Sequence, residues 1–120
     1  MIEGVAGVVI WTDNLESMAQ FYRDILKLPV HSVHPDFVAF EFGDMRFSIG
    51  LHSEVNGPAK DPNRIMVNFA TSDIRKLAEE LKAKGVEFIR EPELEEWGGY
   101  IATFRDPDGN LIQLLQQPKK

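Results

Sequence analysis

The stretch that decides the fold is Phe104-Arg105-Asp106-Pro107-Asp108-Gly109-Asn110-Leu111-Ile112-Gln113-Leu114. Its centre has the chemistry of a tight turn, because Pro107 restricts φ to negative values and Gly109 readily takes a positive φ. The flanking residues 100–105 and 111–115 are rich in aromatic, β-branched and aliphatic side chains. We therefore predict a β-hairpin, and we assign its two inner aspartates to the turn rather than to a catalytic pair.

Working outward from this hairpin, we find the same order of elements twice. The first half predicts a strand at 7–12, a helix capped by Asp13 or Asn14 and stopped by Pro29, and strands at 30–33, 37–42 and 46–51. The second half predicts a strand at 64–70, a helix capped by Ser72 or Asp73 and ended by Gly85, a strand at 86–89, an irregular loop at 91–99, and the hairpin.

The apolar stripes of the two helices also match after a shift of 59 positions, with Leu15, Met18, Ala19 and Tyr22 against Ile74, Leu77, Ala78 and Leu81. Two copies are too few for a solenoid. We therefore predict an α+β fold of two tandem βαβββ modules in a single domain, at about residues 4–54 and 64–117, joined by a linker at 55–63. The sheets are expected to curve around a cavity with the helices outside.

Charge and composition exclude several classes of protein. The 120-residue chain carries a formal net charge of −6, which repels phosphate backbones, so we expect no nucleic-acid partner. The absence of cysteine excludes thiolate metal sites, disulfides and a cysteine nucleophile. No stretch is long and apolar enough for a membrane span, and the first residues lack the features of a signal peptide. A cytoplasmic protein without a membrane partner is expected.

The motifs together resemble the vicinal oxygen chelate superfamily, which includes glyoxalase I, extradiol dioxygenases, fosfomycin-resistance transferases and bleomycin-resistance proteins. The residues that carry the resemblance are Asp13-Asn14-Leu15, the helical Phe21-Tyr22-Arg23-Asp24-Ile25-Leu26, and the hairpin itself. The resemblance spans essentially the whole chain. It specifies the fold more than any one activity.

Metal-dependent members of that family carry four ligand positions, which the resemblance maps onto Gly7, Gly50, Met66 and Gln113. Only Gln113 offers an oxygen donor, and two glycines and a methionine are not ligands for a divalent cation. The resemblance therefore implies no metal and no other cofactor. An unusual metal site that includes His52 or Gln113 stays an alternative, whereas His31 and His34 are expected on opposite faces of their strand, at the surface or rim.

Alternation along the strands predicts which side chains line the cavity. Val8, Ile10, Ile49, Val67, Phe69, Ile112 and Leu114 should pack under the helices. The opposite parity, together with the loop residue Trp97, gives the expected ligand-binding set: Val9, Trp11, Ser48, Gly50, His52, Met66, Asn68, Trp97, Gln113 and Leu115, with Gly7 and Leu111 on the same faces.

Three details of this cavity are part of the prediction. The glycines should leave open room for a ligand, because they stand where side chains converge in the metal-dependent relatives. Trp97 could close over a ligand or plug its own loop, with equal weight. The glutamates of that loop, Glu91, Glu93, Glu95 and Glu96, are interpreted as a solvated face, with an attractor for a cationic ligand as the alternative.

A mostly apolar wall with a few amides and hydroxyls is typical of a pocket for a small organic molecule. We therefore expect a metal-free protein, like the bleomycin-resistance proteins, that binds a small, partly aromatic molecule. The alternative is a superfamily enzyme of the lyase, isomerase or dioxygenase type, with a non-standard metal site or with His52 and Glu41 as acid–base residues. A third reading is a scaffold with a vestigial cavity. A homodimer is expected, and the modules could pair within one chain or across two.

Overall fold

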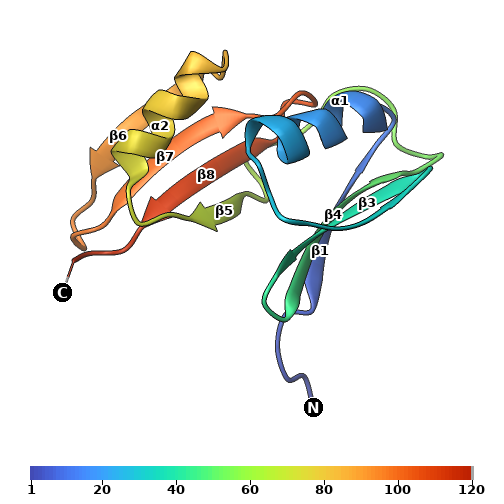
Figure 1. Cartoon of the computed structure of the whole chain (residues 1–120), viewed down its shortest axis with the longest axis horizontal. Coiled ribbons are helices and arrows are strands. Elements are labelled where there is room, and N and C mark those ends of the chain that lie inside the picture. The colour runs from blue at the N-terminus through green and yellow to red at the C-terminus, as the bar shows by residue number, and fades with distance from the viewer. Residues whose placement is uncertain (120) are drawn as a thin grey trace. The chain divides into compact units, whose positions relative to one another are not determined.

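The computed structural model describes residues 1–119, and the chain divides into two compact units, residues 1–57 and the residues from Pro58 onward. Each unit holds one four-stranded sheet with a strand–helix–three-strand order. The predicted α+β fold of two βαβββ modules is therefore confirmed (Figure 1). None of the helices within residues 1–119 has the length and apolar character needed to span a membrane.

Unit one contains β1 (Gly7–Thr12), α1 (Leu15–Gln20), a π-helical turn η1 (Phe21–Ile25), β2 (Val30–His34), β3 (Phe37–Phe42) and β4 (Met45–Leu51). Its sheet has the order β1-β4-β3-β2. β1 runs parallel to β4, whereas the β2–β3 and β3–β4 pairs are antiparallel.

The core of unit one lies between the helical segment and one face of this sheet. The centroid of the Phe47 ring lies 5.1 Å from that of Tyr22 and 6.2 Å from that of Phe40. All three side chains are buried, and full burial of one such side chain stabilises the fold by about 1.5–3 kcal/mol. Ile49 shares this face, as the alternation predicts.

The first helix begins at the predicted place but with different cap chemistry. Asn14 occupies the cap position and its side chain makes no capping hydrogen bond. Instead Thr12 Oγ1 accepts from the Asn14 backbone N–H at 2.9 Å, and Asp13 accepts from the Gly57 N–H at 2.9 Å. The helical segment ends before Pro29, as predicted.

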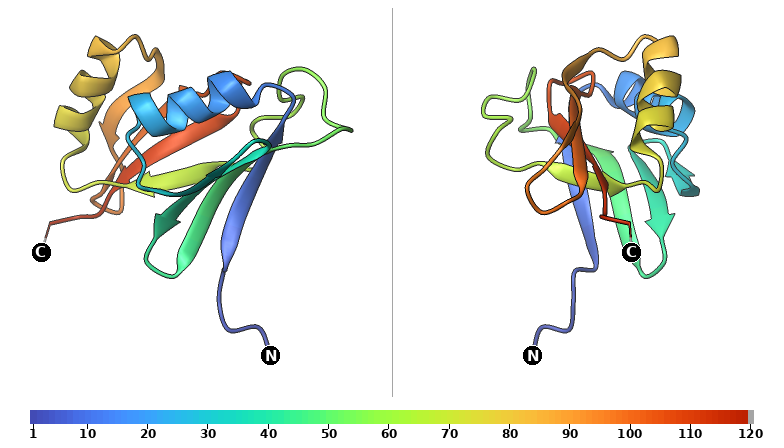
Figure 2. Two further views of the ribbon diagram at one scale, coloured as in Figure 1. Left: turned by 45° about the vertical axis from the view of Figure 1, so that its right-hand side comes forward. Right: turned by 90° about the vertical axis from the view of Figure 1, so that its left-hand side faces the viewer.

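Unit two contains β5 (Val67–Ala70), α2 (Ile74–Ala83), β6 (Phe88–Leu94), β7 (Tyr100–Arg105) and β8 (Leu111–Gln116), in the sheet order β5-β8-β7-β6. Asp73 caps α2 by accepting from the Lys76 N–H at 3.2 Å, and Gly85 follows the helix with φ of +92°, as predicted. The views in Figure 2 show α2 along one face of the sheet that contains β8.

The hairpin of β7 and β8 confirms the structural role of its aspartates. Asp106 Oδ1 accepts from the backbone N–H groups of Asp108 (3.0 Å) and Asn110 (2.9 Å), and its Oδ2 accepts from the Asn110 side-chain amide (2.9 Å). Gly109 takes a φ of +85°. Because Asp106 is buried and used in full by the turn, it is a structural residue.

Two strand boundaries differ from the prediction by three residues or more. The strand expected from Arg64 begins at Val67, because Arg64 closes a turn by donating its N–H to the Asp61 carbonyl (3.2 Å), so Met66 precedes β5. The strand expected to end at Ile89 continues through Pro92 to Leu94. β6 tolerates this proline because it lies at the sheet edge, where its pairing with β7 is irregular.

Candidate functional site

The face of the first sheet opposite the helix is built from three strands in register. Trp11 of β1 pairs with Gly50 of β4, and Gly50 pairs with Phe37 of β3. Two residues earlier along β1 and β4, on the same face, Val9 pairs with Ser48. Val9 and Trp11 are 42% and 43% exposed, which agrees with their predicted position away from the helix.

One end of this face carries a cavity of about 480 Å³ lined by aromatic rings. The Trp11 ring lies 5.4 Å from the His52 ring in an edge-on arrangement with an interplanar angle of 69°. It also lies 6.2 Å from the Phe37 ring at 54°. The described residues that line it are Trp11, Asp36, Phe37, Leu51, His52 and Ser53.

The room expected above Gly50 is occupied by two of these rings. A Cβ atom placed on Gly50 would lie 2.6 Å from Trp11 Cζ3 and 2.8 Å from Phe37 Cδ2. Both distances are shorter than van der Waals contact, so a larger residue here requires the rings to move. The rings of Trp11 and Phe37 therefore pack directly over Gly50. The missing side chain at this position leaves no open space for a ligand, contrary to the prediction.

His52 follows the last residue of β4 and is held by two hydrogen bonds. Its N–H donates to the Thr12 carbonyl at 3.3 Å, and its Nδ1 accepts from the Glu54 N–H at 3.1 Å. An accepting Nδ1 carries no proton, which leaves the ring proton of neutral His52 on Nε2. The sequence predicts that His52 faces the cavity near the end of its strand; it directly follows β4, and its ring lies next to that of Trp11.

The other two histidines correct the prediction of opposite faces. The β2–β3 register shifts between Val30 and Ser32, and such an irregularity turns a side chain to the other face. His31 Nε2 thus reaches Glu41 Oε2 at 3.6 Å, on the face where Glu41 also meets Arg46 at 3.4 Å. His34 pairs with Phe37 and shares this face.

In unit two, the corresponding face carries a polar row. Asn68 of β5 pairs with Gln113 of β8, and Gln113 pairs with Thr103 of β7. Leu115 pairs with Ala70 on the same face, whereas Met66 lies outside the strand. Asn68, Gln113 and Leu115 therefore share one face of the sheet, as alternation predicts, whereas Met66 does not belong to the strand.

The registers also show which positions correspond between the units. Val9 and Ser48 pair in unit one as Asn68 and Gln113 pair in unit two, so Ser48 is the counterpart of Gln113. Gly50 corresponds instead to Leu115, because their partners Trp11 and Ala70 occupy equivalent places.

Neither set of positions suits a divalent cation. The positions that correspond by register are Val9, Ser48, Asn68 and Gln113, which provide no charged or imidazole donor. The positions mapped by the resemblance include Gly7 and Gly50, which have no side-chain donor at all. Within residues 1–119, no three His, Cys, Asp or Glu side chains are grouped so that they could hold a metal ion.

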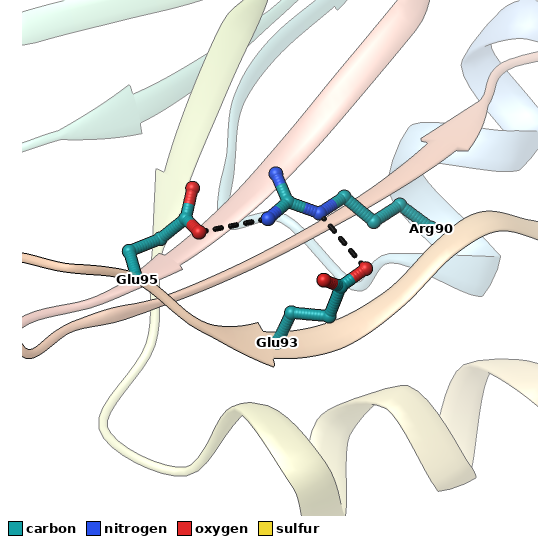
Figure 3. Close-up of polar contacts among 3 residues, drawn as sticks. All are labelled: Arg90, Glu93 and Glu95. Atoms are coloured by element: carbon teal, nitrogen blue, oxygen red, sulfur yellow. Dashed lines mark hydrogen bonds and ion pairs between the residues drawn. The ribbon is translucent and has the colours of Figure 1, made fainter.

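Trp97 packs on its own segment of unit two, and three of the glutamates near it form ion pairs. The Trp97 ring lies against Gly99, where an added Cβ would overlap the ring, and Trp97 is not among the residues that line the cavity near Trp11. Arg90 Nε contacts Glu93 at 3.2 Å, and Arg90 Nη2 contacts Glu95 at 2.8 Å (Figure 3).

The negative charges of these glutamates are mostly compensated by Arg90 and Lys82. The hydrogen bond to Glu95, followed by that to Glu93, raises the pKa of the Arg90 guanidinium. Glu91 forms an ion pair with Lys82 and, as the largest of several causes, raises the pKa of that ammonium. Three of the four glutamates thus face a cation of the chain itself. Glu91 and Glu93 lie on β6 rather than in the irregular loop that was expected at 91–99.

A second cavity, of about 420 Å³, lies at the start of α2 and was not predicted. Its polar groups already serve the fold: Gln116 Oε1 accepts from the Ile74 N–H at 2.7 Å, and Asp73 caps the helix. The Arg75 guanidinium lies over the Tyr100 ring, 5.2 Å from its centroid. The glutamine cap joins residues 42 positions apart, so no local sequence signal could reveal it.

Comparison with known proteins agrees with this architecture. The family model of the Glyoxalase/Bleomycin resistance protein/Dioxygenase superfamily matches residues 4–114. The chain belongs to this superfamily. Within it, the chain is similar to an uncharacterised protein, YraH, of Bacillus subtilis, at 26% identity over 116 residues that cover 87% of this chain and 91% of YraH.

Two further likenesses differ in extent. A bleomycin resistance protein of Klebsiella pneumoniae is 50% identical over 34 residues, which cover 28% of this chain and 27% of that protein. The crystal structure of a protein of unknown function from Agrobacterium tumefaciens superimposes with a TM-score of 0.81 at 23% identity, covering 98% of this chain and 96% of that one. These comparisons establish the superfamily and its fold, and they leave the activity to be argued from the site.

Proposed function

We propose that this superfamily member binds a small, partly aromatic organic molecule in the cavity of unit one, without a metal. The observation that carries the proposal is the convergence of Trp11, Phe37 and His52 on one cavity. The three rings come from the first strand, the third strand and the end of the fourth, so the folded sheet alone brings them together.

The size and chemistry of the cavity support this ligand class. Small-molecule pockets typically enclose about 300–1,000 Å³ and combine apolar walls with a few polar groups. The cavity of about 480 Å³ falls in this range, and its lining combines three rings and Leu51 with the polar residues Asp36 and Ser53. Each well-placed ring pair formed with a ligand contributes about 0.5–1.5 kcal/mol beyond the burial of apolar area.

The metal-free character rests on the donor set. The positions that the resemblance maps to metal ligands, and those that correspond by register, lack the carboxylates and imidazoles that hold divalent cations in proteins. Two of them are glycines that have packing roles instead: a Cβ on Gly7 would lie 2.5 Å from the Arg46 carbonyl oxygen, and Gly50 supports the aromatic rings.

An enzyme that uses acid–base residues is the second candidate function, and one observation favours it. Glu41 and His31 lie 3.6 Å apart on the face that bears the cavity, which is the kind of pair that can move a proton. Arg46 Nη2 also contacts Glu41 Oε2, at 3.4 Å. Neither residue lines the cavity, so binding is the function that the geometry supports better.

The proposal is tested by titrating a panel of small planar aromatic compounds into the chain in excess EDTA, with tryptophan fluorescence as the readout. Some members should quench the fluorescence saturably. The saturable signal should disappear in Trp11→Phe and persist in Trp97→Phe, which is the matched control because Trp97 lies on its own loop. The proposal fails if no compound gives a saturable signal, or if binding appears only after a divalent metal is added.

A further inference from the structure

The wall of the aromatic cavity includes one carboxylate, on Asp36. This residue lies in the turn between β2 and β3, where its carbonyl accepts from the Leu51 N–H at 2.9 Å and so fixes its backbone. Within residues 1–119, no hydrogen bond or ion pair engages its carboxylate. Asp36, a solvent-exposed residue with a fixed backbone, thus lines the same cavity as three aromatic rings.

The surroundings do not neutralise this charge. No lysine or arginine is among the described residues that line the cavity. Arg46, on the same sheet face, already contacts Glu41 at 3.4 Å. His52 is engaged by the chain itself, because its Nδ1 accepts a hydrogen bond from the Glu54 N–H at 3.1 Å.

The rings add an attraction that is specific for cations. The face of an aromatic ring carries partial negative charge, and an ammonium group near the ring centroid is attracted to it, most strongly by tryptophan. The chain as a whole carries a net charge of −6, which favours the approach of a cation over that of an anion. Asp36, Trp11 and Phe37 therefore select the same kind of ligand for two independent reasons.

We propose that the cavity of unit one selects organic cations, with an ammonium group beside Asp36 and an apolar or aromatic body against Trp11 and Phe37. This inference rests on the proposed binding function and specifies its ligand class. The cavity differs in this respect from residues 91–96, where Arg90 and Lys82 compensate three of the four carboxylates.

The test compares two probes that differ only in charge. Para-hydroxyphenyltrimethylammonium and para-tert-butylphenol have the same shape, because a quaternary nitrogen replaces a carbon. Their affinities are measured by calorimetry for the wild-type chain and for two variants. Asp36→Asn removes the charge in the cavity, and Asp44→Asn removes the same charge from the turn between β3 and β4, outside the cavity lining.

We expect the cation to bind about three- to tenfold more tightly than its neutral isostere, given the usual strengths of exposed charge pairs and cation–π contacts. Asp36→Asn should reduce this preference to the part that the rings supply and leave the affinity of the neutral probe unchanged, whereas Asp44→Asn should preserve the full preference. Equal affinity for both probes overturns the inference, and so does an equal effect of the two variants, which would indicate only a general charge effect. In both cases the proposed binding of small organic molecules stands, whereas failure of both probes to bind contradicts that function as well.

Discussion

Replacing Gly50 with alanine tests the aromatic cavity, because the rings of Trp11 and Phe37 pack over this glycine. The new Cβ would stand 2.6 Å from Trp11 Cζ3 and 2.8 Å from Phe37 Cδ2, about 1 Å closer than carbon atoms pack at their optimum. Both rings must therefore move outward. Because Trp11 is already 43% exposed, it can turn toward solvent without unfolding the sheet.

The expected stability cost is small. Overpacking costs about 1–3 kcal/mol, and replacing a strand glycine returns about 0.5–1 kcal/mol of conformational entropy. A net loss of about 1 kcal/mol would lower Tm by roughly 4 °C in a chain of this size. Affinity should fall more, since the loss of two ring contacts worth about 0.5–1.5 kcal/mol each weakens binding by roughly tenfold.

Gly7→Ala is the matched control for this experiment. A Cβ on Gly7 would lie 2.5 Å from the Arg46 carbonyl oxygen, a backbone atom that cannot turn away, so Tm should fall further than in Gly50→Ala. Circular dichroism gives Tm, and calorimetry with para-tert-butylphenol gives the affinity. The reasoning is refuted if Gly50→Ala binds the probe as the wild type does, or if it unfolds the chain while Gly7→Ala does not.

Three further predictions concern the rest of the chain. Asp106→Ala should destabilise the fold by about 2–3 kcal/mol, because it leaves two backbone N–H groups of the hairpin without their charged acceptor; a change below about 0.5 kcal/mol in chemical denaturation would contradict the assignment. Arg90→Gln should lower Tm at low ionic strength, and concentrated NaCl should shrink the difference from wild type, since salt screens the contacts with Glu93 and Glu95; a difference independent of salt argues against this. Light scattering should give the mass of a homodimer, because unpaired sheet edges and exposed apolar side chains such as Val33 and Ile89 favour association, and a mass near 13.6 kDa would show a monomer instead.

The sequence predicted those parts of the fold that local chemistry decides. The Asp-Pro-Asp-Gly turn, the cap at Asp73 and the end of the first helix before Pro29 each follow from backbone preferences of a few neighbouring residues. The orientation of Trp11 follows from alternation alone, because β1 is regular. These features needed no knowledge of distant contacts.

The details of the site depend on distant contacts and could not be predicted in the same way. Gly50 shows in the sequence only that it lacks a side chain, and the rings that fill its space come from positions 39 and 13 residues away. The irregular pairing of β2 reverses the expected direction of His31, and nothing in the alternation signals it. Phe37 could have been found, since Phe37, Ala39 and Glu41 alternate with buried neighbours on the same strand.

The central claim is that an aromatic molecule binds beside Trp11 without a metal, and the chain offers a direct measurement because it has two tryptophans. In a heteronuclear NMR spectrum each indole N–H gives one signal, which the Trp11→Phe and Trp97→Phe variants assign. Titration with para-tert-butylphenol in excess EDTA should move the Trp11 signal saturably and leave the Trp97 signal in place. A saturable shift of Trp97 alone, or no shift of either signal until a divalent metal replaces the EDTA, would contradict the claim.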